Sequence, residues 1–125
     1  MKSLLTGTAL IEGVTGLALA AMPSLLVEIL LGVSLTDPTA IILGRLAGGA
    51  LMTIAFACWL SRANPQSGIM VKAMLGYNVF ATTLLVYAAL VEKLSGPGLW
   101  PAVIVHIGLL AWSLSSLRKP VPKVI

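Results

Sequence analysis

The stretch that decides the fold is residues 39–60, TAIILGRLAGGALMTIAFACWL, in which Arg45 is the only charged residue. An α-helix rises about 1.5 Å per residue, so a run of this length crosses a hydrocarbon core about 30 Å thick. Three further runs of similar length and composition occupy residues 4–22, 69–91 and 99–117. The segments between them contain the Gly, Pro, Asn and Asp residues that favour turns. The sequence therefore predicts four membrane-spanning helices.

The composition of the whole chain points the same way. Of the 125 residues, 58% are hydrophobic and 10% are charged, whereas a soluble domain carries about 25% charged residues. These values exclude a soluble globular enzyme and a disordered tail, and a lone cysteine, Cys58, excludes a disulfide-stapled secreted domain. We expect an all-α integral membrane four-helix bundle that forms one transmembrane domain over residues 1–125.

The basic residues predict how the chain is threaded. One side of the predicted membrane receives Lys2, Arg62, Lys72, Arg118, Lys119 and Lys123. The other side receives Lys93 and, just inside the second span, Arg45. Basic residues concentrate on the cytoplasmic side of membrane proteins, so both termini are expected in the cytoplasm. The net charge of +4 is thereby explained by topogenic flanks, without a nucleic-acid partner.

Two features near the N-terminus need separate interpretation. The apolar start resembles a signal peptide, but Glu12 interrupts it, which favours an uncleaved first span. Residues 23–31, PSLLVEILL, follow this span and begin with a proline, a residue favoured at the first position of a helix. They predict a short helix at the outer interface, or else a kinked continuation of the first span.

Small residues predict where the helices pack closely. Gly13 and Gly16 share one helical stripe in the first span, and Gly44 and Gly48 form a GxxxG motif in the second. Such residues let helix backbones approach in lipid, where the hydrophobic effect does not drive association. We expect a tight contact between the first two spans, or between two copies of the chain.

Each predicted span contains one polar residue that is costly to place in lipid. These residues are Glu12, Arg45, Asn78 and His106, and Tyr77 lies on a neighbouring face. Ionisable groups in membrane helices face the bundle interior and find partners there. No second histidine or cysteine pair accompanies His106, so no metal site is predicted, and no catalytic constellation is recognisable.

Three interpretations of the polar residues stay open. Glu12 and Arg45 could form a buried ion pair that fixes helix register, with Asn78 and His106 capping it. The same residues could instead line a polar pocket in the outer half of the bundle, open to a ligand or a proton. In the third arrangement Arg45 extends outward to lipid phosphates.

Several short motifs suggest a family. They are Leu30-Leu31-Gly32, the run from Leu43 to Gly49, Gly76-Tyr77-Asn78, and Leu99-Trp100-Pro101-Ala102-Val103 with His106. In these motifs the chain resembles the small four-span bacterial membrane proteins called DoxX-like. The resemblance implies a compact four-helix bundle in the bacterial inner membrane. It also implies a link to quinone-coupled oxidation as a membrane subunit, although most members of the family have no assigned activity.

A second resemblance is to the small multidrug resistance transporters. These are also four-span chains, with a first-span glutamate that exchanges protons for cationic drugs, and Glu12 falls at a matching place. The chain departs from that family because Arg45 would compete with a cation, and because the aromatic and glycine pattern of the later spans is missing.

Three functions follow as hypotheses. The first is a non-catalytic bundle that acts as a homo-oligomer or as an accessory subunit of a larger membrane complex. The second is a protein that binds a lipophilic ligand, such as a quinone or a lipid, through Arg45, Asn78 and His106. The third is proton-coupled export of small molecules through Glu12.

Overall fold

The computed structural model describes residues 1–118 and, within them, contains five helices and no strand. They are α1 (Lys2–Ala21), α2 (Pro23–Leu31), α3 (Pro38–Ser61), α4 (Ser67–Leu90) and α5 (Leu99–Arg118). All but α2 are long and apolar enough to cross a membrane, which confirms the expected all-helical chain with four candidate spans. The basic, proline-containing tail with Lys119 and Lys123 lies outside the described residues.

Local sequence explains where α2 and α3 begin and end. Met22, with φ −133° and ψ 64°, leaves the helical conformation and separates α1 from α2. Gly32 ends α2 with φ +77°, in the left-handed region that glycine adopts at little cost. Asp37 caps α3 by accepting a 3.0 Å hydrogen bond from the backbone N–H of Ala40. Residues 23–31 therefore form a separate short helix and not a continuation of the first span.

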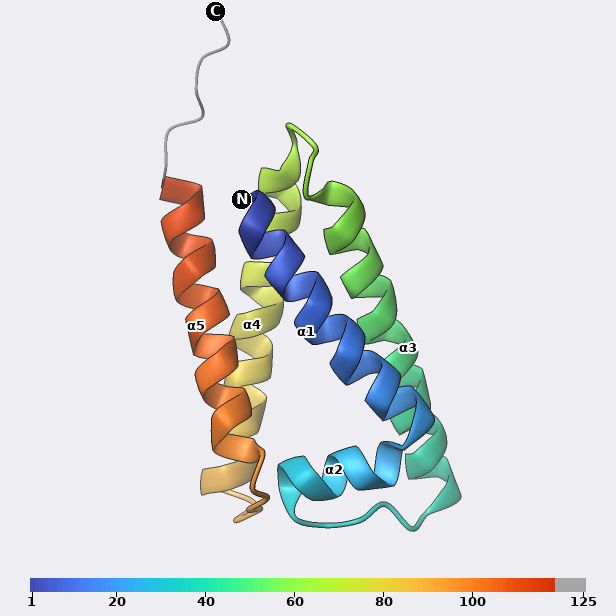
Figure 1. Ribbon diagram of the computed structural model, residues 1–125. Coiled ribbons are helices and arrows are strands. Elements are labelled where there is room, and N and C mark those ends of the chain that lie inside the picture. The colour runs from blue at the N-terminus through green and yellow to red at the C-terminus, as the bar shows by residue number, and fades with distance from the viewer. Residues whose placement is uncertain (119–125) are drawn as a thin grey trace, which may run out of the picture.

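The long helices associate in two pairs. α1 packs along α3, α4 packs along α5, and contacts between the pairs are far fewer. Figure 1 shows α1 and α3 leaning away from α4 and α5 towards one end of the bundle, where α2 lies across the gap between the pairs. The beginning of α1 and the end of α5 lie together at the opposite end (Figure 1).

The packed core lies at the end of the bundle that holds the N-terminus. It consists of Leu4, Leu5, Ala9, Cys58, Val71, Met74 and Leu109. These residues come from all four long helices, so this end is closed by interdigitated apolar side chains. The polar residues described below lie between this core and α2.

The α1–α3 pair is held by direct backbone contact at two glycines. A Cβ atom added to Gly16 would lie 2.8 Å from the carbonyl oxygen of Gly48, and one added to Gly48 would collide with the backbone nitrogen of Ala20. At Gly13 the added atom would lie at an ordinary 3.5 Å from the Cβ atom of Ala55. Gly44 faces Pro23, at the start of α2, with a separation of 3.0 Å for its added Cβ. All four glycines thus lie at contacts inside one chain.

Candidate ligand-binding cavity

A cavity of about 440 Å³ lies between the two helix pairs, and α2 contributes to its wall. Ligand pockets in proteins commonly span ~300–1,000 Å³. Most of its lining is aliphatic or aromatic, and four polar side chains interrupt it, those of Glu12, Thr15, Tyr77 and His106. The remaining lining residues are Ile11, Leu19, Leu26, Leu30, Leu51, Phe80, Ala81, Leu84, Leu85, Ala102 and Val105.

Glu12 is the most unusual of the lining residues. Its side chain is buried, with 1% of its surface exposed, in a helix of membrane-spanning length. The hydroxyl of Tyr77 donates a 3.2 Å hydrogen bond to Oε2 of Glu12, while Oε1 has no hydrogen-bond partner among the described residues. A buried polar atom without a partner costs about 1–3 kcal/mol, and such atoms are rare in folded proteins. The unpaired Oε1 atom is therefore a candidate contact for a ligand.

His106 is held from behind by the fully buried side chain of Asn78. Asn78 donates from Nδ2 to the carbonyl oxygen of Met74, at 2.7 Å, so its Oδ1 atom is the one that faces the imidazole. Nδ1 of His106 lies 2.8 Å from this Oδ1 atom. An amide oxygen only accepts, so Nδ1 of His106 donates and carries a proton. A neutral ring then has a lone pair on Nε2.

Tyr77 connects the glutamate to the histidine. Its ring meets that of His106 edge to face, with 5.8 Å between centroids, while its hydroxyl bonds Glu12. Of the residues singled out from the sequence, Glu12, Tyr77, Asn78 and His106 therefore form one connected cluster. Asn78 reaches the cavity only through His106 and does not line it. Sequence periodicity could not assign Tyr77 as the partner of Glu12, because it does not fix how each helix is rotated.

Arg45 does not belong to this cluster, and the proposed Glu12–Arg45 ion pair is not formed. The guanidinium of Arg45 donates from Nη1 to the carbonyl oxygens of Ala20, at 2.7 Å, and Ala21, at 3.4 Å. The register of the Gly16–Gly48 contact explains the error. It places Arg45 opposite Ala20, which lies eight residues after Glu12 and thus about 12 Å farther along α1. A count of residues inward from the ends of the predicted spans instead places the two side chains only about 5 Å apart along the helix axes.

The wall formed by α2 was not anticipated from the sequence. Leu26 and Leu30 of α2 line the cavity. The C-terminal end of α2 is bonded to the α4–α5 connection, since Gly98 donates its N–H to the carbonyl oxygen of Ile29 at 2.8 Å, and Ser95 donates to that of Leu31 at 3.2 Å. Two residues of the α4–α5 connection thus bond the end of α2 and hold this helix across the gap between the helix pairs.

The cavity also reaches the faces of the bundle that lipid would cover. Ile11, Phe80, Leu84 and Val105 line it and yet are exposed on the outside of the helices, Phe80 by 67%. Ile11 and Val105 belong to α1 and α5, and Phe80 and Leu84 to α4. Exposed side chains of three helices therefore form part of the cavity lining.

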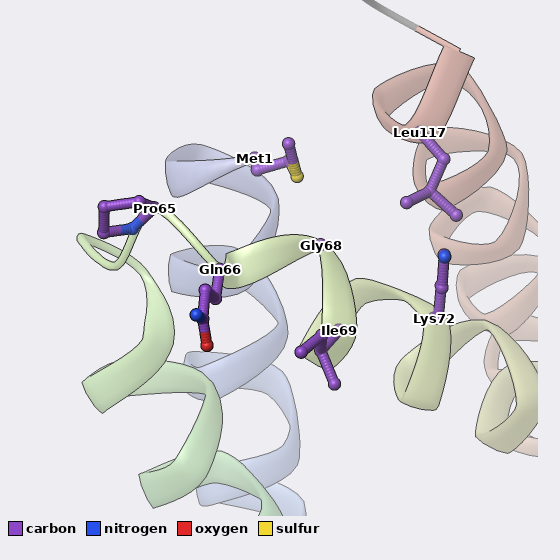
Figure 2. Close-up of a pocket in the computed structure, with 7 residues that line it drawn as sticks. All are labelled: Met1, Pro65, Gln66, Gly68, Ile69, Lys72 and Leu117. Carbon is purple, nitrogen blue, oxygen red and sulfur yellow. The ribbon is translucent and has the colours of Figure 1, made fainter. Parts of the chain in front are cut away.

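A second hollow, of about 430 Å³, lies at the opposite end of the bundle. Figure 2 shows the side chain of Lys72 pointing towards Leu117, with Met1 and the start of α4 on the other side of the hollow. Gln66, Ile69 and Lys72 are all exposed there. This hollow presents no buried polar atom without a partner and resembles an ordinary surface groove.

Among residues 1–118 no group of three or more His, Cys, Asp or Glu side chains could hold a metal ion. No family model, curated protein or solved structure matches the chain. The cavity is therefore the feature from which we infer a function. It is an apolar chamber with a carboxyl group, a phenol and an imidazole at its inner end.

Proposed function

We propose that this chain is a multi-pass membrane protein that binds a small lipophilic molecule with a polar head group. The observation that carries the proposal is the unpaired Oε1 atom of Glu12 at the inner end of a largely apolar cavity. A ligand whose head bonds this atom would remove the cost of leaving it unpaired. The apolar walls would accommodate the rest of the molecule.

The ligand classes that we propose are a quinone or a lipid. Both are dissolved in the bilayer, and the exposed lining residues provide a lateral way in. We also propose that the chain is DoxX-like, in line with its motifs, and a quinone would agree with that resemblance. The four apolar helices fit the bundle that the resemblance implies.

We further propose that both termini are cytoplasmic and that the membrane is the bacterial inner membrane. Lys2, Arg62, Lys72 and Arg118 cluster towards the end of the bundle that holds the start of α1, and the positive-inside rule supports this orientation. In this orientation α2 would lie at the outer interface.

The homo-oligomer or accessory-subunit hypothesis has less support. It depends partly on the glycine stripes, but Gly16 and Gly48 already pack against each other within one chain. The exporter hypothesis keeps one argument, because Arg45 does not neutralise Glu12. In the experiments below, tightest binding of a cationic probe would favour this hypothesis.

The test is native mass spectrometry of the detergent-purified protein, combined with solvent extraction of bound molecules. We expect a lipophilic compound bound at one copy per chain. The variant Ala102→Phe, which adds a ring to the cavity wall, should abolish its retention. The matched control Ala111→Phe lies on an exposed face of the same helix and should leave retention unchanged. A chain that retains the same compound after Ala102→Phe would contradict the proposal.

A further inference from the structure

We infer that the head group accepted by this cavity is a hydroxyl, presented by a lipophilic alcohol, phenol or hydroquinone whose apolar part points towards α2. The inference rests on the proposed function and narrows its ligand classes to a hydroxyl-bearing lipid or the reduced, hydroquinone form of a quinone. It follows from two side chains that Tyr77 links and that both line the cavity, Glu12, whose Oε1 atom has no partner among the described residues, and His106.

The histidine atom is an acceptor. Because Asn78 donates from Nδ2 to Met74, its Oδ1 atom accepts a hydrogen bond from Nδ1 of His106. Nε2 of the neutral ring is left with a lone pair. Within residues 1–118 this nitrogen makes no hydrogen bond, although His106 lines the cavity.

Whether Oε1 of Glu12 donates or accepts a hydrogen bond depends on whether the carboxyl group is protonated. Tyr77 donates to Oε2, so Oε1 is the free atom. In the carboxylate form Oε1 accepts a hydrogen bond, and in the acid form with the proton on this atom it donates one. A head group that suits the site in both forms must be able to donate and to accept.

A hydroxyl meets this requirement with a single oxygen atom. It donates to Nε2 of His106 while accepting from protonated Glu12, or it donates to the Glu12 carboxylate. A ketone or quinone carbonyl accepts only, so it leaves Nε2 of His106 unpaired in both forms. An ammonium donates only, so it suits the carboxylate and not the acid.

The shape of the cavity sets the direction of the ligand. Glu12 lies seven residues before Leu19 on α1, which corresponds to about 10 Å along the helix. Beyond Leu19 the wall continues with Leu26 and Leu30 of α2, and no charged side chain lines that part. The head therefore lies next to Glu12, deep in the bundle, and the apolar part extends towards α2.

The experiment compares four probes that share a hexylphenyl body: 4-hexylphenol, 4-hexylacetophenone, 4-hexylbenzylammonium and 4-hexyltoluene. Their Kd values are measured with radiolabelled probes by equilibrium dialysis against the full-length protein in identical micelles. We expect 4-hexylphenol to bind about tenfold more tightly than the other three, the order of magnitude that one or two net hydrogen bonds supply. Ala102→Phe should weaken binding of all four, and Ala111→Phe should not.

A variant then tests the residue behind the preference. Glu12→Ala should reduce the advantage of 4-hexylphenol over 4-hexyltoluene to about threefold or less, because only the His106 contact remains. Thr53→Val removes an exposed hydroxyl outside the cavity, one bonded to the carbonyl oxygen of Gly49, at nearly constant volume and should preserve the advantage. If Glu12→Ala does not fold, the ranking of probes in the unmodified protein still decides the question.

The outcomes separate the two proposals. If the probes bind in a manner blocked by Ala102→Phe but the ketone equals or exceeds the phenol, the cavity binds ligands and the hydroxyl assignment is wrong. Tightest binding of the ammonium likewise overturns it and favours the exporter hypothesis. Absence of any binding that Ala102→Phe blocks overturns the proposed function and this inference together.

Discussion

Oδ1 of Asn78 lies 2.8 Å from Nδ1 of His106, and the other end of the same amide is bonded to the carbonyl oxygen of Met74. A flipped amide would turn Oδ1 towards the Met74 carbonyl oxygen, which cannot donate, so the bond to Met74 fixes the orientation of the amide. The amide therefore determines that the imidazole nitrogen facing Asn78, Nδ1, carries the proton. The chemistry offered to a ligand by α5 is thus set by a residue of α4 that does not itself line the cavity.

This arrangement predicts the tautomer of the histidine. His106 is the only histidine of the chain, so ¹⁵N-histidine labelling gives one assignable pair of ring resonances. We expect the neutral ring to carry its proton on Nδ1. Asn78→Leu should shift the population away from this form, because the acceptor is removed. A neutral ring protonated on Nε2 in the unmodified protein would contradict the arrangement.

Tyr77 should contribute to stability through its hydroxyl. Tyr77→Phe leaves both carboxyl oxygens of Glu12 without a partner among residues 1–118, and we expect the free energy of unfolding to fall by about 1–3 kcal/mol. Tyr87→Phe is the matched control, since Tyr87 is exposed and bonds Glu92. Its effect should stay within about 0.5 kcal/mol. Reversible unfolding in mixed micelles provides the measurement.

A double-mutant cycle tests whether the Tyr77 effect runs through Glu12. Replacing both partners by apolar groups can be nearly neutral, so Glu12→Leu with Tyr77→Phe should cost less than Tyr77→Phe alone. Additive losses would show that the two side chains are not coupled.

The α1–α3 contact predicts a sharp difference between adjacent glycines. A methyl group at Gly48 meets the backbone of Ala20 and Gly16, which cannot move aside without separating the helices. We expect Gly48→Ala to lower the free energy of unfolding by about 1–3 kcal/mol. Gly49→Ala introduces the same methyl group where nothing lies within 4 Å and should be neutral or mildly stabilising. Equal effects of both substitutions would refute the contact.

Arg45 should act on the end of α1 and not on the ligand. Its guanidinium bonds the carbonyls of Ala20 and Ala21, where the negative end of the α1 dipole lies. Arg45→Ala should therefore cost about 0.3–1 kcal/mol, Arg45→Lys should recover part of this loss, and 4-hexylphenol should bind both variants as before. Lost binding at unchanged stability would place Arg45 in the site after all.

The sequence located the helices well and the contacts between them poorly. The lengths of the apolar runs place all four long helices within two residues of their observed ends. This is possible because about 20 apolar residues are required to cross lipid, and because residues that favour turns separate the runs. The separate α2 was one of two alternatives, and its place across the bundle depends on contacts with residues 95–98 that no local pattern encodes.

The candidate site was predictable in membership but not in pairing. Polar residues in membrane helices face inward, which is why the sequence singles out Glu12, Asn78 and His106. Their partners depend on helix rotation and register. The Gly16–Gly48 contact places Arg45 about two helical turns away from Glu12 along α1. Tyr77, and not Arg45, is therefore the hydrogen-bond partner of Glu12.

The hydrogen bonds from residues 95 and 98 to the end of α2 have a consequence for biosynthesis. A chain made from its N-terminus completes α1, α2 and α3 while α4 and α5 are still to come. The glycine contact between α1 and α3 can form at that stage, but the far wall of the cavity and the support for α2 do not yet exist. Capacity to hold a ligand is then the last property the nascent protein gains, so a bound molecule would report that both helix pairs have been inserted and joined.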